Sequence, residues 1–408
     1  MRPEARSTVE RVSVDLRTRT DADVPAVDAE RFFGVDLPEA AERRPDLVET
    51  ASELKLPPLA VEVGGRTWVL RRDGDSIHVE AGTADDTVRL TPERLADLVN
   101  DQVTPVGLMM AGEVAFDRAM PKFMDWWLLL RSLLDERPVH RPGDVALPDD
   151  LGRSFTLDDD PAELRAYLEA AGYLHLRGVF APGEMATVSD EMDAAAPTYA
   201  DDGGTHSWWA TVKDGERRLV RMLGFHERSP TTARLLADDR FQSLGRIPGE
   251  GRNGPWRWRG GAEGLFKPLT VQQGISDVPW HKDCAPGRHS YDCCSLTVGV
   301  SVTGADATSG QLRVIAGSHR ALVWPSLFDA SSLDLPDLPL PTETGDVTIH
   351  LSCTLHMAQP PVDRERRVLY TGFALRPLDP EAATAGQRRL RDTRDAAPRN
   401  TSQVASGA

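Results

Sequence analysis

The sequence predicts an α+β domain followed by an all-β sandwich or barrel with flanking helices. In the N-terminal half, residues 69–79 read as two short strands joined by Asp73-Gly74, and a helix begins at Thr91-Pro92. Asp-Gly favours the tight turn of a hairpin, and threonine before proline is a common start of a helix. In the C-terminal half, Gly, Pro and Asp turns separate short apolar segments at about 268–275, 295–302, 311–316, 346–351 and 367–375. Many short strands with regular turns indicate a sandwich or barrel.

Changes in composition divide the 408-residue chain into five segments. The first is charged and contains prolines without a sustained apolar period, and the last has almost no large apolar side chains. A stretch rich in Pro, Gly and acidic residues between the two halves predicts a linker. The expected segments are a charged extension at 1–44, an α+β domain at 45–137, a linker at 138–160, the β-rich domain at 161–378 and a disordered tail at 379–408.

Charge and hydropathy argue against several classes of partner. The net charge of −16 and the pI near 5.1 disfavour nucleic acid and anionic membranes, because phosphate groups would be repelled. The apolar cluster from Trp126 to Leu130 is too short to cross a bilayer, and residues 1–20 lack the apolar core of a signal peptide. The four cysteines form no Cys-x-x-Cys pair, which favours reduced thiols and a cytoplasmic location. We expect a small-molecule partner, and the sequence leaves the oligomeric state open.

A histidine and an aspartate lie two residues apart in His281-Lys282-Asp283. Residues i and i+2 of a strand face the same side, so His281 and Asp283 are expected to converge while Lys282 points away. Two ligands rarely hold a metal, and the segment GDVTIHLSCTLHMAQ offers a second histidine, either His350 or His356. Two histidines and one carboxylate form the facial triad of non-haem iron(II) oxygenases. A pair in a surface loop is the alternative interpretation.

Longer motifs extend this pattern in order: WHKD, then SGQLRVIAGSHR, then GDVTIHLSCTLHMAQPPVDRERRVLY. With AELRAYLEAAGYLHLRGVFAPGEM upstream, they resemble the phytanoyl-CoA hydroxylase-like family of iron(II) and 2-oxoglutarate-dependent oxygenases over about 161–378. The resemblance implies a double-stranded β-helix (jelly-roll) fold, with iron held by His281, Asp283 and His356. It also implies that Arg367, eleven residues after His356, binds the distal carboxylate of 2-oxoglutarate, with O2 as the other cosubstrate.

Strand alternation places Arg366 and Arg367 on opposite faces, and the resemblance, which puts Arg367 in the carboxylate-binding position, implies that Arg367 points inward and Arg366 outward. His319 and His350 are interpreted as structural histidines. Three positions near the site depart from the family without removing an expected ligand: Ala358 where it has serine, Lys282 where it commonly has glutamine, and Gly299 where many members have tryptophan.

Residues 45–137 resemble a sterol-carrier-protein-like domain through GGRTWVLRRDGDSIHVE, TPERLADLVN, PVGLMMAGEVAF and a closing apolar helix. This resemblance implies a lipid tunnel, and with it an apolar or carrier-bound substrate that is hydroxylated at a C–H bond in natural-product biosynthesis. The alternative is a domain that only dimerises or positions its neighbour. Trp208-Trp209 and Trp256/Trp258 are either an aromatic lid or ordinary packing. Two other functions stay open: a lipid carrier with a non-catalytic jelly-roll half, and a cupin-like metal hydrolase or isomerase.

Overall fold

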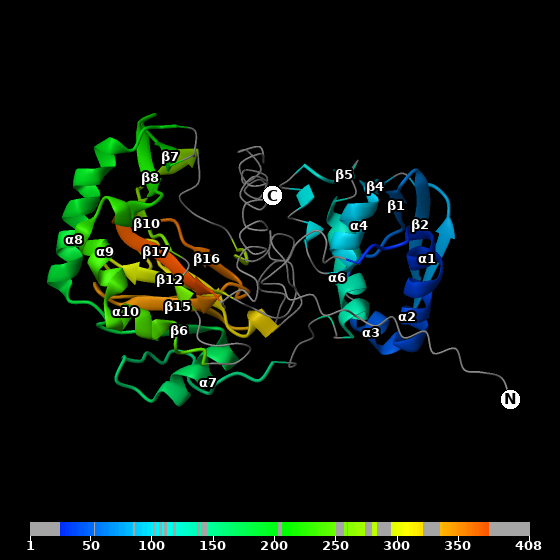
Figure 1. Cartoon of the computed structure of the whole chain (residues 1–408), viewed down its shortest axis with the longest axis horizontal. Coiled ribbons are helices and arrows are strands. Elements are labelled where there is room, and N and C mark those ends of the chain that lie inside the picture. Colours follow the sequence, from blue (N-terminus) through cyan, green and yellow to red (C-terminus); the bar gives the residue numbers. More distant parts are fainter. Residues whose placement is uncertain are drawn as a thin grey trace.

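The computed structural model has two large, separate hydrophobic cores among the described residues, one in each half of the chain (Figure 1). It describes residues 25–374 except 53, 85, 101–102, 106–107, 110–111, 117–119, 137–138, 140–144, 203–205, 250–256, 259, 274–279, 284–294 and 321–334. The expected tail at 379–408 lies outside the described residues. In the described part of the chain, no helix has the length and apolar character needed to cross a membrane.

The N-terminal core is built on a mixed five-stranded sheet with the order β3-β2-β1-β4-β5. Strands β1 and β4 are parallel, and the other neighbours are antiparallel. The predicted hairpin is confirmed, because Asp73 pairs with Ser76 across a turn in which Gly74 has a φ of 61°. The strands are β1 Leu59–Val63, β2 Arg66–Asp73, β3 Ser76–Ala81, β4 Thr87–Leu90 and β5 Ala115–Phe116.

Helices complete this core and confirm the α+β class. The hydroxyl of Thr91 accepts a hydrogen bond from the Arg94 N–H at 3.3 Å, so the predicted start of helix α4 is correct. Trp126 and Trp127 are fully buried in helix α6. The helices are α1 Ala29–Arg31, the π-helix η2 Phe32–Asp36, α2 Leu37–Arg43, α3 Pro45–Thr50, α4 Pro92–Val99 and α6 Met120–Asp135.

Two expected segment boundaries differ from the structure. Phe33 and Leu37 lie in the N-terminal core, so the described part of the extension expected at 1–44 belongs to the first domain. The π-helix interrupts the 3.6-residue period there, which hides the apolar pattern in the sequence. Within the linker expected at 138–160, Phe155 is buried in the C-terminal core and forms a parallel bridge with Leu176.

The C-terminal half contains two β-sheets that enclose a barrel, as expected for a double-stranded β-helix. The larger has the order β11-β7-β8-β10-β17-β12-β15-β6, with β9 beside β17, and the smaller has the order β14-β13-β16. All pairings between these strands are antiparallel. The strands are β6 Tyr173–Leu176, β7 Ser207–Val212, β8 Arg217–Met222, β9 Arg257–Trp258, β10 Glu263–Lys267, β11 Val271–Gln273, β12 Ser295–Ser301, β13 Leu312–Ile315, β14 Asp337–Leu340, β15 Val347–Leu351, β16 His356–Ala358 and β17 Arg366–Ala374.

Helices lie on the outer side of the larger sheet (Figure 1). The ring of Phe241 packs on Phe373 of β17, with 5.0 Å between centroids. Trp258 packs in the same layer, and its Nε1–H donates to the hydroxyl of Thr371 at 2.7 Å, so this tryptophan is a packing residue and not part of a lid. The helices are α7 Pro161–Ala171, α8 Pro182–Ala195, η3 Ala196–Thr198, η4 Phe225–Glu227, α9 Pro230–Ala237, α10 Asp239–Leu244 and η5 Ser318–Arg320.

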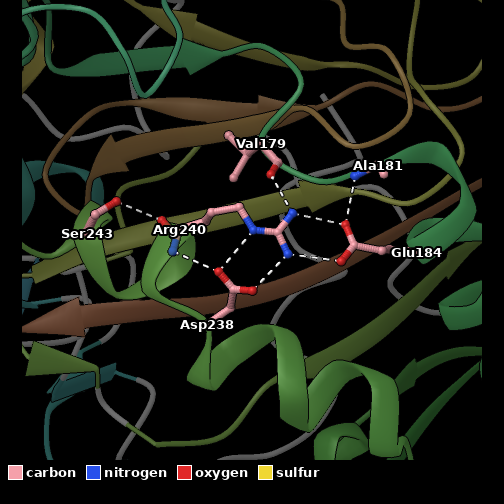
Figure 2. A network of polar contacts seen from close by, with 6 residues as sticks. All are labelled: Val179, Ala181, Glu184, Asp238, Arg240 and Ser243. Carbon is pink, nitrogen blue, oxygen red and sulfur yellow. Dashed lines mark hydrogen bonds and ion pairs between the residues drawn. The ribbon is translucent and has the colours of Figure 1, made fainter.

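Arg240 joins α10 to α8 near the end of β6 (Figure 2). Its guanidinium donates to the carboxylates of Glu184 at 2.9 Å and Asp238 at 2.8 Å, and to the carbonyl of Val179 at 3.2 Å. Glu184 also accepts from the Ala181 N–H at 2.8 Å, at the start of α8. The hydrogen bonds from Arg240 lower the pKa of Asp238 to about 2. This network ties two helices of the outer layer together.

Asp346 anchors the start of β15. Its buried carboxylate accepts hydrogen bonds from the Gly178 N–H at 2.8 Å, the Glu343 N–H at 2.9 Å and the Nε2 of His175 at 2.9 Å. Burial raises the pKa of Asp346, but the bonds from His175 and the two N–H groups outweigh it, and the pKa lies below its usual value. The aspartate of the Gly-Asp motif is therefore a structural residue that fastens β15 to the turn after β6.

Asp346→Ala is expected to lower the free energy of unfolding by about 3 kcal/mol, because two partly buried hydrogen bonds from N–H groups lose their charged acceptor. The contribution of the carboxylate should be complete above pH about 4 and disappear as the pH falls through the depressed pKa of the folded state. Urea denaturation of both proteins at pH 7 and pH 3 measures this. The exposed Asp190 supplies the control Asp190→Ala, and equal losses for the two variants would contradict the anchor role.

Candidate metal centre

His281 and His356 form an isolated antiparallel bridge between chain segments far apart in the sequence. The N–H of His281 donates to the carbonyl of His356 at 2.9 Å, and the reverse bond is 3.0 Å. The Oδ1 of Asp283 lies 3.4 Å from the Nε2 of His281 and 3.6 Å from the Nε2 of His356. One ligand atom from each of the three side chains lies within 4.8 Å of the others. The predicted convergence of these side chains is confirmed.

Hydrogen bonds around this cluster orient its members. Lys282 is buried and its Nζ donates to the carbonyl of Ser318 at 3.0 Å, so it points away from the cluster as expected. The Nδ1 of His356 lies 2.8 Å from the carbonyl of Thr354, which fits a tautomer with its proton on Nδ1. The Nε2 of His356 then keeps its lone pair, which is the form that a metal requires.

The protonation states suit metal binding. Burial raises the pKa of Asp283, but His356, His281 and His350 outweigh it and hold that pKa well below its usual value. Burial, with the neighbouring His350 and His281, holds the pKa of His356 well below its usual value. Asp283 is therefore ionised and His356 neutral at pH 7. Two imidazole nitrogens and one carboxylate oxygen in these forms fit iron(II), which accepts exactly such a mixed set on one face of an octahedron.

His350 belongs to the same cluster, although the sequence predicts it to be the structural one of the two candidate histidines. It is 1% exposed, and its ring centroid lies 4.1 Å from that of His356. Its Nε2 is 3.5 Å from the Oδ2 of Asp283, the oxygen opposite to the one that faces His281 and His356. The structure therefore brings His350 beside the three expected ligands but on the outer side of the carboxylate.

The expected orientation of the two arginines is wrong. Arg367 points to the outer helices, where its Nη1 donates to the carboxylate of Asp193 at 2.7 Å and to the carbonyl of Ser189 at 2.9 Å. Arg366 is the inward residue, 4% exposed, and its Nη1 donates to the carbonyl of Gly310 at 2.7 Å. Its Nε has no hydrogen-bond partner among the described residues.

Pairing between strands explains the reversal. Tyr370 of β17 lies opposite Gly299 of β12, and Thr348 of β15 lies on the other side of Gly299. Arg366, Val368 and Tyr370 therefore share the face that looks into the barrel. Strand alternation correctly predicts that the two arginines lie on opposite faces of β17. Counting residues from His356 does not show which face is inward, because the loop at 359–365 separates β16 from β17.

A small cavity lies against this inner face, and Arg366 is one of the residues that line it. Lys267, 2% exposed, pairs with Arg366 across β10 and β17, so two buried cations lie side by side there. The ring of Tyr370 lies against Gly299, where a Cβ would be 3.3 Å from the ring and 2.9 Å from the hydroxyl of Thr348. The cavity is lined by Gly299, Ser301, Ala305, Leu312, Leu340, Thr342, Thr348, Arg366, Val368 and Tyr370. Lys267 was not predicted as a residue of the site. The sequence signal that could have indicated it is a lysine at the end of the short strand segment EGLFK, residues 263–267.

His319 has the expected structural role. It is buried, and its Nε2 donates to the carbonyl of Glu169 at 2.9 Å near the end of α7. Burial lowers its pKa to about 4, so the ring is neutral at pH 7. A Cβ at Gly172 would collide with this ring, which explains the glycine after α7.

Comparison with known proteins identifies one family and several similar folds. The family described as phytanoyl-CoA dioxygenase (PhyH) matches residues 168–368. No curated protein matches the chain. AviO1 from Streptomyces viridochromogenes Tue57 has 21% sequence identity, covers 54% of this chain and 97% of its own, and has a TM-score of 0.43. EctD from S. alaskensis, solved with 2-oxoglutarate and 5-hydroxyectoine, has 20% identity, 58% and 86% coverage and a TM-score of 0.42. The epimerase SnoN, solved with Fe3+, alpha ketoglutarate and nogalamycin RO, has 21% identity, 53% and 84% coverage and a TM-score of 0.41.

Proposed function

We propose, on the premise that residues 168–368 make this chain a member of the phytanoyl-CoA dioxygenase family, that the protein is an iron(II) and 2-oxoglutarate-dependent oxygenase. The observation that carries the proposal is the cluster of His281, Asp283 and His356, whose ligand atoms lie within 4.8 Å inside the barrel. A buried guanidinium on the same inner surface supports it, because a cation enclosed in a barrel requires an anion.

Each part of the inner surface has a role in this proposal. His281, Asp283 and His356 hold iron(II), and Arg366 binds the distal carboxylate of 2-oxoglutarate in place of Arg367. Lys267 adds positive charge beside Arg366. With iron bound, the centre couples activation of O2 to decarboxylation of 2-oxoglutarate. The enclosing sheets orient these groups and exclude water.

The substrate in this proposal is a small molecule that gains a hydroxyl group at a C–H bond. The same donor set serves desaturation, epoxidation and ring closure, so the product must be identified by experiment. The resemblance to a lipid-type domain favoured an apolar or carrier-bound substrate. However, the described residues of that domain enclose an apolar cavity of about 20 Å³, which has the size of a water molecule and not of a lipid chain. This cavity does not support a lipid tunnel, and we propose a positioning role for the N-terminal domain.

Release of succinate from 2-oxoglutarate tests the function. The purified protein, supplied with Fe(II), O2 and 2-oxoglutarate, is expected to form succinate faster when a metabolite extract contains its substrate. Mass spectrometry of the extract then distinguishes the gain of one oxygen atom, which indicates hydroxylation or epoxidation, from the loss of two hydrogens. Protein that binds Fe(II) but neither binds 2-oxoglutarate nor forms succinate would contradict the oxygenase proposal and favour a metal hydrolase or isomerase.

A further inference from the structure

We propose that His350 and Thr297 are positioning residues that hold the outer oxygen of Asp283, so that its other oxygen alone faces the iron. The inference rests on the iron centre proposed above and assigns it two further residues. Neither residue belongs to the His-x-Asp and distal histidine pattern by which the centre is recognised in the sequence.

Sheet register brings the two side chains to one place. Thr297 of β12 lies directly opposite His350 of β15, and side chains at paired positions share a face of the sheet. The hydroxyl of Thr297 donates to the Oδ2 of Asp283 at 2.6 Å. The Nε2 of His350 lies 3.5 Å from the same oxygen. Two neighbouring strands of the larger sheet thus approach one oxygen of the carboxylate.

The other oxygen of Asp283 has different neighbours. Its Oδ1 lies 3.4 Å from the Nε2 of His281 and 3.6 Å from the Nε2 of His356. The two oxygens are therefore divided, one toward the ligand nitrogens and one toward the sheet. A carboxylate that used both oxygens on the metal would occupy a position that the cosubstrates need. Holding Oδ2 to the sheet prevents this and fixes the direction of Oδ1.

The ring nitrogens of His350 lack hydrogen-bond partners among the described residues, and a bond from Nε2 to the Oδ2 of Asp283 would supply one. The His350 ring is 1% exposed. A buried polar group without a partner is destabilising, so the Nε2 position calls for an acceptor. The separation of 3.5 Å from Oδ2 exceeds the usual length of about 2.7–3.2 Å for such a bond. A small rotation of the carboxylate as Oδ1 takes up metal closes this gap.

Metal affinity tests the inference without using turnover. Fe(II) is titrated anaerobically into wild type, His350→Ala, His350→Gln and Thr297→Val against a coloured chelator, and Co(II) absorption reports the coordination geometry. His350→Ala and Thr297→Val are expected to keep one metal per chain while the dissociation constant rises by about 10- to 100-fold. His350→Gln should restore most of the affinity, because its amide N–H reaches the position of Nε2. His319→Ala removes another buried imidazole, one that contacts Glu169, and should leave the dissociation constant unchanged.

Three results would overturn the inference. An unchanged dissociation constant in His350→Ala, with a lower melting temperature like that of His319→Ala, would make His350 a packing residue. Loss of metal with a changed Co(II) spectrum, not restored in His350→Gln, would make it a ligand. If His350→Ala does not fold, an unchanged dissociation constant in Thr297→Val would refute the shared role. Wild type that binds neither Fe(II) nor Co(II) would instead overturn the proposed iron centre itself, which separates that failure from the other three.

Discussion

Asp283→Ala is expected to raise the dissociation constant for iron(II) by more than about 100-fold, which exceeds the effect of changing a residue that only orients a ligand. Asp283 supplies the only negative charge among the three converging ligand atoms. Without it, two neutral imidazoles would hold a divalent cation in a partly buried site, which is a weak arrangement. Anaerobic titration with Fe(II), followed by iron analysis after gel filtration, measures the loss. Succinate formation should disappear in parallel.

A matched control for this experiment is Asp337→Ala. Asp337 is a carboxylate on β14 that forms an ion pair with Arg313 at 2.9 Å. Its replacement should leave the dissociation constant for iron(II) within about twofold of the wild-type value. An exposed ion pair contributes little to the stability of the fold, so its loss should not disturb the metal ligands. If Asp283→Ala bound iron(II) as tightly as Asp337→Ala, the assignment of the ligands would be wrong.

Arg366→Ala is expected to weaken binding of 2-oxoglutarate by roughly a hundredfold while iron(II) binding stays close to that of the wild type. The physical reason is the loss of two charge-assisted hydrogen bonds to the distal carboxylate, about 3 kcal/mol in total. Titration of 2-oxoglutarate into the Fe(II)-loaded protein without oxygen, followed by its visible absorption band, gives the dissociation constant. Arg366→Lys should recover only part of the affinity, because an ammonium cannot make the paired contact.

The neighbouring residue is the natural control. Arg367→Ala removes an ion pair with Asp193 on α8 and leaves the inner face of β17 unchanged. It should have the wild-type affinity for 2-oxoglutarate and a free energy of unfolding lower by about 1 kcal/mol or less. The opposite ranking of the two variants would show that the barrel takes up 2-oxoglutarate with the other face of β17 turned inward.

Local patterns were sufficient to predict one part of the site. The predicted convergence of His281 and Asp283 is confirmed, although the segment forms only an isolated bridge at His281, followed by a turn at Asp283, and not the expected strand. The short strands and turns likewise predict the β-sheets of the C-terminal half, because each depends on residues close together in the chain. The Asp-Gly hairpin of the N-terminal sheet is confirmed for the same reason.

Features that depend on pairing between distant strands could not be predicted in this way. The inward face of β17 is set by the contact of Tyr370 with Gly299 on β12, and no count along the chain contains that register. His350 is one of two candidates in the sequence for the second histidine, and only its pairing with Thr297 shows that it lies beside the outer oxygen of Asp283. The early boundary of the first domain was hidden for another reason, since a π-helix at Phe32–Asp36 shifts the apolar period.

The contact between Gly299 and Tyr370 has a consequence for how this barrel can change during evolution. The two residues lie opposite each other on β12 and β17, and the Tyr370 ring occupies the space that a side chain at position 299 would need. A side chain at 299 would have to displace the Thr348 hydroxyl, 2.9 Å from its Cβ, and shift the Tyr370 ring, 3.3 Å away, so substitutions at these three positions are not expected to be additive. We expect Gly299, Thr348 and Tyr370 to behave as an epistatic unit that controls the volume of the cavity beside Arg366.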